Sequence, residues 1–194
     1  MGNIKVSDAI VRPFTHFSRL FLGAILSLIP VLNLFSVGYL IKCINKPGMP
    51  AWSLNVFLKG LLALIIAFVY AIPASILFGF VSMMNLPYDN LFMIPFLVLV
   101  MITGYIIPAA IINFAKNGFF FKNVFKKAFS PEYFIAFLLG LFWAGLLNFI
   151  SVAAMRILFF VLPLSIFIIV SVLISSVLFF ASEITFISLL SEAS

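Results

Sequence analysis

The first long apolar run of the chain, residues 20–41, has basic residues on both sides and a break in its middle, Pro30-Val31-Leu32-Asn33. Three basic residues precede the run and three follow it: Lys5, Arg12, Arg19, Lys42, Lys46 and Lys59. A helix that crossed a bilayer once would place these two groups on opposite sides, against the tendency of Lys and Arg to stay on the cytoplasmic side. The run therefore predicts a re-entrant or half-spanning helical hairpin that enters and leaves by the same face.

The composition predicts an all-α, polytopic helical membrane protein. Of the 194 residues, 65% are hydrophobic and only 8% are charged, which is too few to cover a soluble domain. A helix needs about 20 apolar residues to cross a hydrocarbon layer of about 30 Å. We expect one membrane domain over 1–194, with transmembrane helices at 54–81, 91–115, 132–155 and 160–190.

The distribution of basic residues favours the hairpin over a fifth straight span. With a hairpin and four spans, ten of the eleven Lys and Arg residues lie on one side, and only Arg156 lies on the other. Five straight spans would leave only seven on that side. The hairpin topology predicts cytoplasmic N- and C-termini, and it places Asp89 on the outer side with Arg156, where the two could pair.

Two amphipathic stretches, 1–19 and 116–129, predict helices that lie in the membrane interface, with Phe residues toward the lipid. Ser130-Pro131-Glu132 predicts the start of the next helix, because a capping hydroxyl, an early proline and an acid stand together. The turn between the last two spans is expected between 148 and 163. The predicted contacts to lipid headgroups are Arg12, Arg19, Lys122, Lys126 and Lys127.

The net charge of +6 is explained by these cations beside apolar segments, which suit anionic lipids and orientation in the membrane rather than nucleic acid. His16 is the single histidine and Cys43 the single cysteine, so neither suggests a metal site. No phosphate loop or nucleophile elbow is present. We therefore expect no catalytic residue, no metal and no cofactor, and a protein that is not an enzyme.

Three polar residues are candidates for an intramembrane site: Asn33, Arg156 and Glu183. Arg156 is either a residue that extends to the outer interface, paired with Asp89, or a functional group in the membrane. Glu183 is either an interfacial acid that faces cytoplasmic lysines or a carboxylate that binds a proton or a cation.

Prolines are expected to break helices at Pro30, Pro73 and Pro108. The segments Tyr70-Ala-Ile-Pro73-Ala and Tyr105-Ile-Ile-Pro108-Ala have the same spacing, and a proline inside a helix leaves a backbone carbonyl without its partner. Discontinuous helices of this kind form the sites of secondary transporters, whereas prolines are also common in ordinary membrane helices.

Several short elements resemble an uncharacterised prokaryotic family of membrane proteins, domain of unknown function 4013. They are Pro13-Phe14, Ile29-Pro30-Val31-Leu32-Asn33, Gly38-Tyr39-Leu40, Met49-Pro50-Ala51-Trp52, Phe57-Leu58-Lys59-Gly60, Tyr70-Ala71-Ile72-Pro73 and the segment from Pro108-Ala109 to Ala128-Phe129. Ser53 and Asn55 replace acidic residues that are usual around the Pro-Trp element. The resemblance implies a prokaryotic cytoplasmic membrane and carries no known activity.

Three functions remain open from the sequence. The first is a non-enzymatic membrane module that binds lipid, in particular anionic lipid, or a partner membrane protein or a second copy of itself. The second is a small secondary transporter or channel-like protein that uses the helices broken by proline. The third is an accessory subunit of a membrane enzyme complex.

Overall fold

A computed structural model of the chain describes residues 5–45, 48–83, 93–118 and 121–193, and every regular element in these residues is a helix. The N-terminal part contains four short elements: α1 (Val6–Val11), the 3-10 helix η1 (Arg12–Thr15), α2 (Phe17–Ser27) and α3 (Asn33–Ile44). The remainder contains four long helices and one short helix: α4 (Asn55–Met83), α5 (Met93–Asn117), α6 (Val124–Ala128), α7 (Pro131–Val161) and α8 (Leu164–Ala193). The predicted all-α fold class is confirmed.

Four helices are long and apolar enough to cross a membrane: Asn55–Phe80, Ile94–Asn117, Pro131–Val161 and Leu164–Ala193. They correspond to the four predicted spans. With 31 and 30 residues, α7 and α8 are each about 45 Å long at 1.5 Å per residue. That exceeds a hydrocarbon thickness of about 30 Å, so this pair fits a bilayer only with a tilt or with its ends outside the apolar layer.

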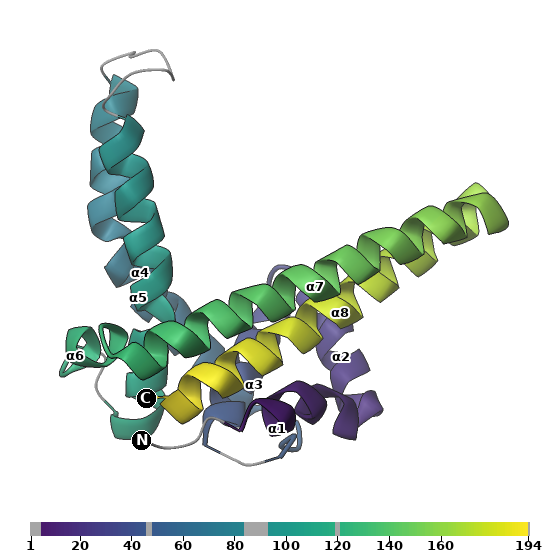
Figure 1. Cartoon of the computed structure of the whole chain (residues 1–194), viewed down its shortest axis with the longest axis horizontal. Helices are drawn as coiled ribbons and strands as arrows, with labels where there is room; N and C mark the ends of the chain where they lie inside the picture. Colours follow the sequence, from purple (N-terminus) through teal and green to yellow (C-terminus); the bar gives the residue numbers. More distant parts are fainter. Residues whose placement is uncertain (1–4, 46–47, 84–92, 119–120, 194) are drawn as a thin grey trace.

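The long helices form two antiparallel pairs that diverge from a common base (Figure 1). The α4–α5 arm and the α7–α8 arm separate toward their turns, and the short helices α1, α2 and α3 lie at the base and beside α8 (Figure 1). The two ends of the chain meet at this base, where the backbone N–H of Lys5 donates a hydrogen bond of 2.8 Å to Glu192 Oε2.

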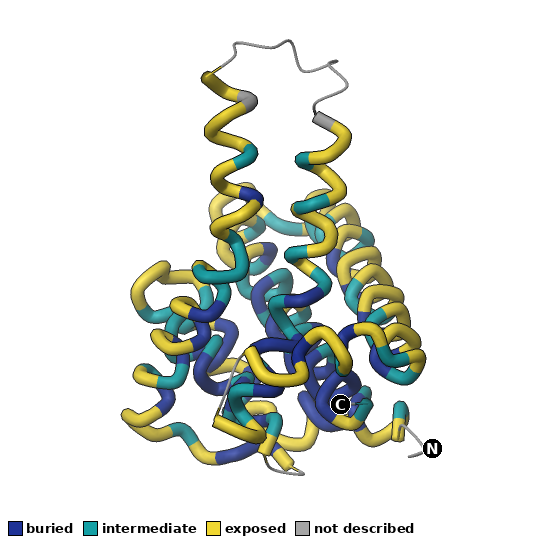
Figure 2. Tube along the Cα trace, turned by 90° about the vertical axis from the view of Figure 1, so that its left-hand side faces the viewer, coloured by how far each residue is buried: buried dark blue, intermediate teal, exposed yellow. Residues whose placement is uncertain are grey.

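Most buried residues lie at the base, and the outer part of the α4–α5 arm is largely exposed (Figure 2). One cluster joins α1 with the long helices and includes Ile66, Ile112, Tyr133 and Leu190. A second cluster joins α2 and α3 to α8 and includes Leu20, Tyr39 and Phe180. Apolar side chains that are exposed along the arms are expected to contact acyl chains, since lipid is as apolar as they are.

Helices α3 and α4 pack backbone against backbone at two glycines. A Cβ atom added to Gly38 would lie 1.7 Å from the carbonyl oxygen of Val56, and one added to Gly60 would lie 1.8 Å from that of Leu34. No side chain other than hydrogen fits such a contact. Small residues commonly mediate close packing between membrane helices, and here they fix the hairpin arm α3 against the first long helix.

Helices α2 and α3 form a helical hairpin whose turn contains the exposed Pro30. Backbone hydrogen bonds satisfy part of this turn, from Asn33 N–H to Ile29 (2.8 Å) and from Phe35 N–H to Leu32 (2.9 Å). The hydroxyl of Ser36 donates to the Gly23 carbonyl at 2.9 Å and so ties α3 to α2. Pro30 therefore separates two helices, as the sequence predicts.

Pro73 and Pro108, in contrast, lie inside helices that continue without interruption. The expected breaks at these two prolines are absent. A proline removes one helical hydrogen bond, but ending the helix in an apolar environment would leave several backbone groups unpaired, which costs far more. The helices therefore continue through both prolines.

The two predicted interfacial helices are shorter than expected. The first was predicted over 1–19, of which residues 1–4 lie outside the described part. In its place the chain forms α1, η1 and α2. His16, before α2, is not helical (φ −139°, ψ 83°). In place of a helix over 116–129, α5 extends to Asn117 and only α6 follows. Pro13 in η1 and Gly118 at φ 74° account for the interruptions.

The turn between the last two spans lies at Leu162 and Pro163, at the end of the predicted window. Leu162 is extended (φ −107°, ψ 145°), as expected of a residue before proline. Helix α7 therefore ends six residues later than the predicted 132–155. At its other end the prediction is confirmed, since the Ser130 hydroxyl accepts a hydrogen bond of 3.2 Å from Tyr133 N–H and Pro131 opens the helix.

The α3–α4 contact can be tested with Gly38→Ala. Forcing a methyl group against the Val56 carbonyl should cost about 1–3 kcal/mol, so we expect the unfolding midpoint in mild detergent, followed by tryptophan fluorescence, to fall by about 5 °C. Gly79→Ala is the matched control, because no atom lies within 4 Å of its added Cβ. Equal midpoints for the two variants would contradict the close approach.

Candidate functional site

Arg12 is buried at the base and connects four parts of the chain. Its Nη1 donates to Ser188 Oγ in α8 at 2.9 Å, and its Nη2 donates to the carbonyls of Cys43 at 2.5 Å and Gly48 at 2.9 Å. A guanidinium has five N–H donors in a fixed plane, which suits several acceptors around one point. Arg12, one of the predicted headgroup contacts, is thus buried and bonded within the protein.

Further donors hold the connection between α3 and α4, of which residues 48–53 are described. Arg19 donates to the Met49 carbonyl, the Tyr39 hydroxyl to the Pro50 carbonyl at 2.8 Å, and Lys42 Nζ to the Ala51 carbonyl at 2.6 Å. Trp52 stacks on Tyr39 with ring centroids 4.2 Å apart. Successive carbonyls of the 48–53 connection are thus held by side chains from η1, α2 and α3.

The remaining predicted headgroup contacts cluster around α6. Lys122 and Lys126 are exposed and Lys127 is half-buried. Three phenylalanines of the same segment are more than half exposed, and we call them, together with Lys122 and Lys126, the Phe–Lys patch: Phe121, Phe125 and Phe129. Val124 and Ala128, which lie between these phenylalanines in the sequence, are fully buried.

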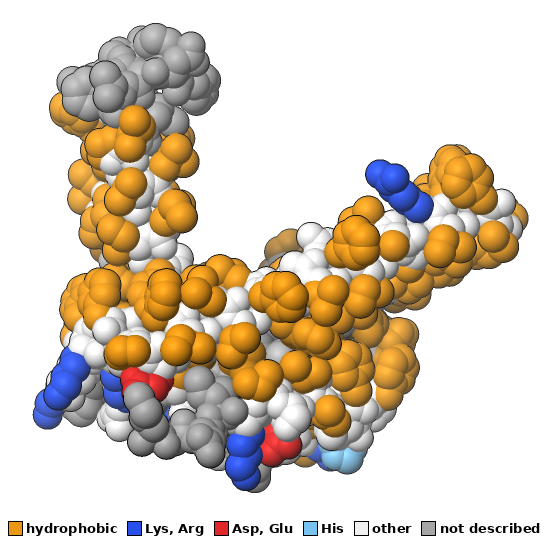
Figure 3. All heavy atoms as spheres, viewed as in Figure 1, with side chains coloured by type: hydrophobic (Ala, Val, Ile, Leu, Met, Phe, Trp, Pro, Cys, Tyr) orange, Lys and Arg blue, Asp and Glu red, His pale blue; other side chains and the backbone are white. Residues whose placement is uncertain are grey.

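Two hydrogen bonds fix the Phe–Lys patch on the neighbouring helix. The Tyr105 hydroxyl donates to the Ala128 carbonyl at 2.5 Å, and Asn113 Nδ2 donates to the Lys122 carbonyl at 2.7 Å. The short helix α6 is therefore anchored to α5. Figure 3 shows charged side chains along the lower edge of the molecule and a hydrophobic band above it, which is the pattern of a membrane interface.

A polar hollow of about 420 Å³ lies at the same base, between α1 and the ends of α3, α5 and α8. Both signs of charge line it, from Lys5, Asp8, Arg12, Lys116 and Glu192. Lys116 Nζ donates to the Ser191 carbonyl at 2.5 Å. The basic groups give this hollow partners for the phosphate of a phospholipid headgroup.

The three predicted intramembrane polar residues do not form one site. Asn33 opens α3 at the hairpin turn, the half-buried Glu183 lies in α8, and the exposed Arg156 lies five residues before the end of α7. Within the described residues, the side chains of Asn33 and Glu183 make no hydrogen bond or ion pair, and none of the three lines the cavity described below. The predicted partner of Arg156, Asp89, lies outside the described residues.

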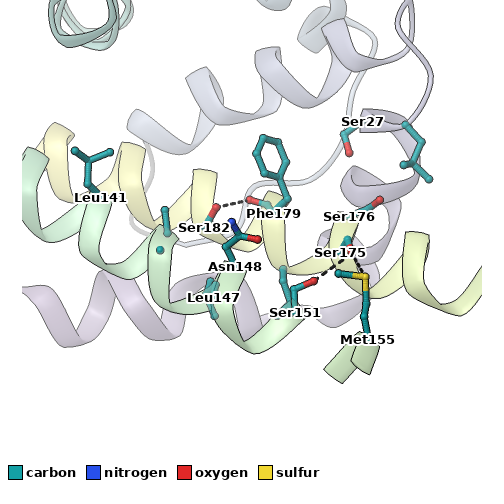
Figure 4. Close-up of a pocket in the computed structure, with 14 residues that line it drawn as sticks. Ser27, Leu141, Leu147, Asn148, Ser151, Met155, Ser175, Ser176, Phe179 and Ser182 are labelled. Atoms are coloured by element: carbon teal, nitrogen blue, oxygen red, sulfur yellow. Dashed lines mark hydrogen bonds between the residues drawn. The ribbon is translucent and has the colours of Figure 1, made fainter. Parts of the chain in front are cut away.

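Sequence analysis missed a cavity of about 630 Å³ between the end of α2, the middle of α7 and the middle of α8. We call it the serine cavity, since its polar lining consists mainly of hydroxyls: Ser27, Asn148, Ser151, Ser175, Ser176 and Ser182. Figure 4 shows these side chains converging from the three helices. The signal available in the sequence is the helical spacing of small and polar residues Ala144, Asn148, Ser151 and Met155 in an otherwise apolar helix.

Among the described residues, no group of three or more His, Cys, Asp and Glu could hold a metal ion. We call the positively charged base of the molecule, with its Phe–Lys patch and polar hollow, the basic base. The candidate sites of this chain are therefore the basic base and the uncharged serine cavity.

Comparison with known families identifies the chain. The family described as Protein of unknown function (DUF4013) matches residues 22–156, which is more than half of the 194 residues. The chain belongs to this family. The predicted resemblance is thereby confirmed, and no role is assigned to the family. Neither the curated proteins nor the solved structures contain a match to this chain.

The match to DUF4013 begins in α2 and ends in α7. It therefore contains the hairpin turn, the close contact between Gly38 and Gly60, and the 48–53 connection. Arg12 and α8 lie outside the matched residues, although Arg12 bonds to the end of α3 and to this connection. The family segment is thus completed by contacts from both ends of the chain.

Arg12→Leu tests whether the guanidinium holds the base together. Its loss leaves buried acceptors unpaired at a cost of about 3 kcal/mol, so we expect the unfolding midpoint in detergent to fall by roughly 6–12 °C. Arg12→Lys should recover little, because an ammonium group cannot reproduce the planar set of donors. Arg156→Leu, at an exposed position, is the control and should leave the midpoint unchanged; an equal effect of Arg12→Leu and Arg156→Leu would contradict this role.

Proposed function

We propose that this DUF4013 member is a non-enzymatic multi-pass protein of a prokaryotic cytoplasmic membrane that binds anionic phospholipid at its basic base. The observation that carries the proposal is the Phe–Lys patch, where exposed phenylalanines alternate with exposed lysines on a segment anchored to α5. Phenylalanine rings enter the acyl boundary while lysines meet phosphates. Each lysine near an anionic surface contributes about 1 kcal/mol.

The polar hollow supports the same function. It lies at the base, it is about 420 Å³ in volume, and its basic residues include Lys5 and Lys116. A headgroup bound there would contact α1, α5 and α8 together, so lipid would stabilise the meeting point of the two chain ends.

The proposal includes a topology in which α2 and α3 form a half-spanning, re-entrant hairpin and both chain ends are cytoplasmic. These helices have 11 and 12 residues, which gives each about 17 Å, little more than half the apolar layer. Leu28, Ile29 and Val31 at the turn are exposed apolar residues, as suits a tip in acyl chains.

A transporter is the second candidate, and the observation in its favour is the serine cavity, a polar space beside long apolar helices. Solute uptake into liposomes distinguishes it from the first, with Asn148→Leu as the probe of the cavity and Glu183→Gln and Asn33→Ala as probes of the other polar residues. An accessory role in a membrane complex, or a homo-oligomer, would use the exposed faces of the arms, and native mass spectrometry from mild detergent would reveal the companion chain.

Anionic-lipid binding predicts that the double variant Lys122→Gln/Lys126→Gln loses lipid selectivity. In nanodiscs of mixed phosphatidylglycerol and phosphatidylcholine, the wild type should retain phosphatidylglycerol preferentially in native mass spectra. Loss of two lysines should weaken that preference by about tenfold or more. Arg156→Gln, which also removes a positive charge, should retain it. Absence of a preference in the wild type, or its persistence in the double variant, would refute the proposal.

The hairpin topology predicts that cysteines placed at Ser7 and Ser53, both exposed, react with a membrane-impermeant maleimide from the same side. The natural Cys43 is buried, and burial raises the pKa of its thiol to about 12. It should therefore stay unreactive in the folded protein. Ser165→Cys, beside the α7–α8 turn, should react only from the other side. Labelling of Ser7→Cys and Ser53→Cys from opposite sides would exclude the hairpin.

A further inference from the structure

The serine cavity is polar but carries no charge. Its lining contains no Lys, Arg, Asp or Glu, and its apolar members include Leu28, Leu141 and Phe179. These three side chains are also exposed on the outer surface, so the cavity opens among residues that would face acyl chains. A phosphate or an ammonium group would find no opposite charge there, and an unpaired charge within the bilayer is costly. The lining therefore favours an uncharged ligand that enters from the lipid.

Three of the five serine hydroxyls use their protons within their own helices. Ser27 donates to the Ala24 carbonyl at 2.7 Å, Ser176 to that of Val172 at 2.7 Å, and Ser182 to that of Phe179 at 2.7 Å. A hydroxyl has one proton and two lone pairs. Each of these serines therefore offers the cavity acceptor capacity and no donor.

The other two serines form a chain. The hydroxyls of Ser151 and Ser175 lie 3.1 Å apart, and either of them can be the donor. The Ser175 hydroxyl can also donate to Met155 Sδ at 3.6 Å. Figure 4 shows this chain along one wall of the cavity. At least one of the two protons is used inside the chain, so this wall too presents mainly lone pairs. The five hydroxyls together make the serine cavity a site for a hydrogen-bond donor.

Asn148 is the one lining side chain with unused donors. It lies near the middle of α7, and no hydrogen bond from its amide is present among the described residues. Figure 4 shows the amide projecting into the cavity beside Ser182. An amide has two donors and two lone pairs, so Asn148 can both give a hydrogen bond to a hydroxyl oxygen and accept one from its proton.

We propose that the serine cavity binds the hydroxyl-bearing head of an uncharged lipid of the diacylglycerol class. The lipid hydroxyl donates to Asn148 Oδ1 or a serine lone pair and accepts from Asn148 Nδ2. Its ester groups occupy the space beside Ala144 and Gly145, and its acyl chains leave past Leu28 and Leu141. A volume of about 630 Å³ lies in the range of sites for small molecules.

This proposal is independent of the basic base, because the two sites differ in charge and in position. Phosphatidylglycerol selectivity depends on Lys122 and Lys126, whereas the serine cavity contains neither. Loss of either behaviour leaves the other unchanged, so failure of one proposal is distinguishable from failure of the other.

The test is binding of dioctanoylglycerol to the full chain in detergent, measured as bound mass by native mass spectrometry and as a saturation curve. The matched ligand is its methyl ether, which has the same chains but no hydroxyl proton. We expect saturable binding of dioctanoylglycerol and about tenfold weaker binding of the ether, as one lost hydrogen bond predicts. Dioctanoyl phosphatidic acid, which is charged, should not compete for the cavity.

Two variants separate the polar and the steric parts of the site. Asn148→Leu removes the free amide and should weaken dioctanoylglycerol binding about tenfold or more. Gly145→Leu fills the cavity without a change in its hydrogen bonds; because a Cβ there meets no atom within 4 Å, the variant should fold and fail to bind.

The controls are Ser171→Ala and Gly104→Leu. Ser171 donates to the Phe167 carbonyl at 2.6 Å in the same helix but does not line the cavity, and a Cβ at Gly104 also meets no atom within 4 Å. Both variants should bind as the wild type does. Equal binding of the methyl ether, or unchanged binding in both Asn148→Leu and Gly145→Leu, would overturn the proposal. A dimer that disappears in Gly145→Leu without bound lipid would assign the cavity to a helix of a second copy instead.

Discussion

The base of this molecule depends on one buried guanidinium. Arg12 joins η1 to the end of α3, to the 48–53 connection and to α8, segments separated by up to 176 residues in the chain. A buried charge is stable only when its hydrogen-bond partners surround it, and here these are the carbonyls of Cys43 and Gly48 and the hydroxyl of Ser188. The fold of the N-terminal hairpin and its attachment to the last helix therefore share one set of contacts.

Above this base, the two long helix pairs diverge and contribute little buried surface to each other (Figures 1 and 2). In a membrane this arrangement carries no penalty from exposed apolar groups, because acyl chains replace the missing neighbours. The polar groups that remain along the arms are then the chemically informative ones. Hydroxyls in the serine cavity and the amide of Asn148 stand out because they line one cavity among apolar helices.

Local features of the sequence predicted the parts of the fold that depend on neighbouring residues. The four spans follow from apolar length, the start of α7 from Ser130 and Pro131, and the division between α2 and α3 from Pro30. The interfacial stretches were predicted less well, since both are interrupted and each contains a buried residue, Arg12 in one and Val124 in the other. Their burial depends on partners such as Ser188 that are distant in sequence. The helical spacing of polar and apolar residues does not predict such partners.

The amino-acid sequence by itself determined that the chain is helical, that four segments are long and apolar enough to cross a bilayer, and where α7 begins. These properties depend on backbone hydrogen bonding in an apolar medium and on capping, which act over a few residues. Only the tertiary structure decided that Pro73 and Pro108 leave their helices intact, that Arg12 is buried, and that serines from three helices enclose one cavity. Each of these features depends on contacts between residues that are distant in sequence. The packing of the whole chain decides which of these residues meet.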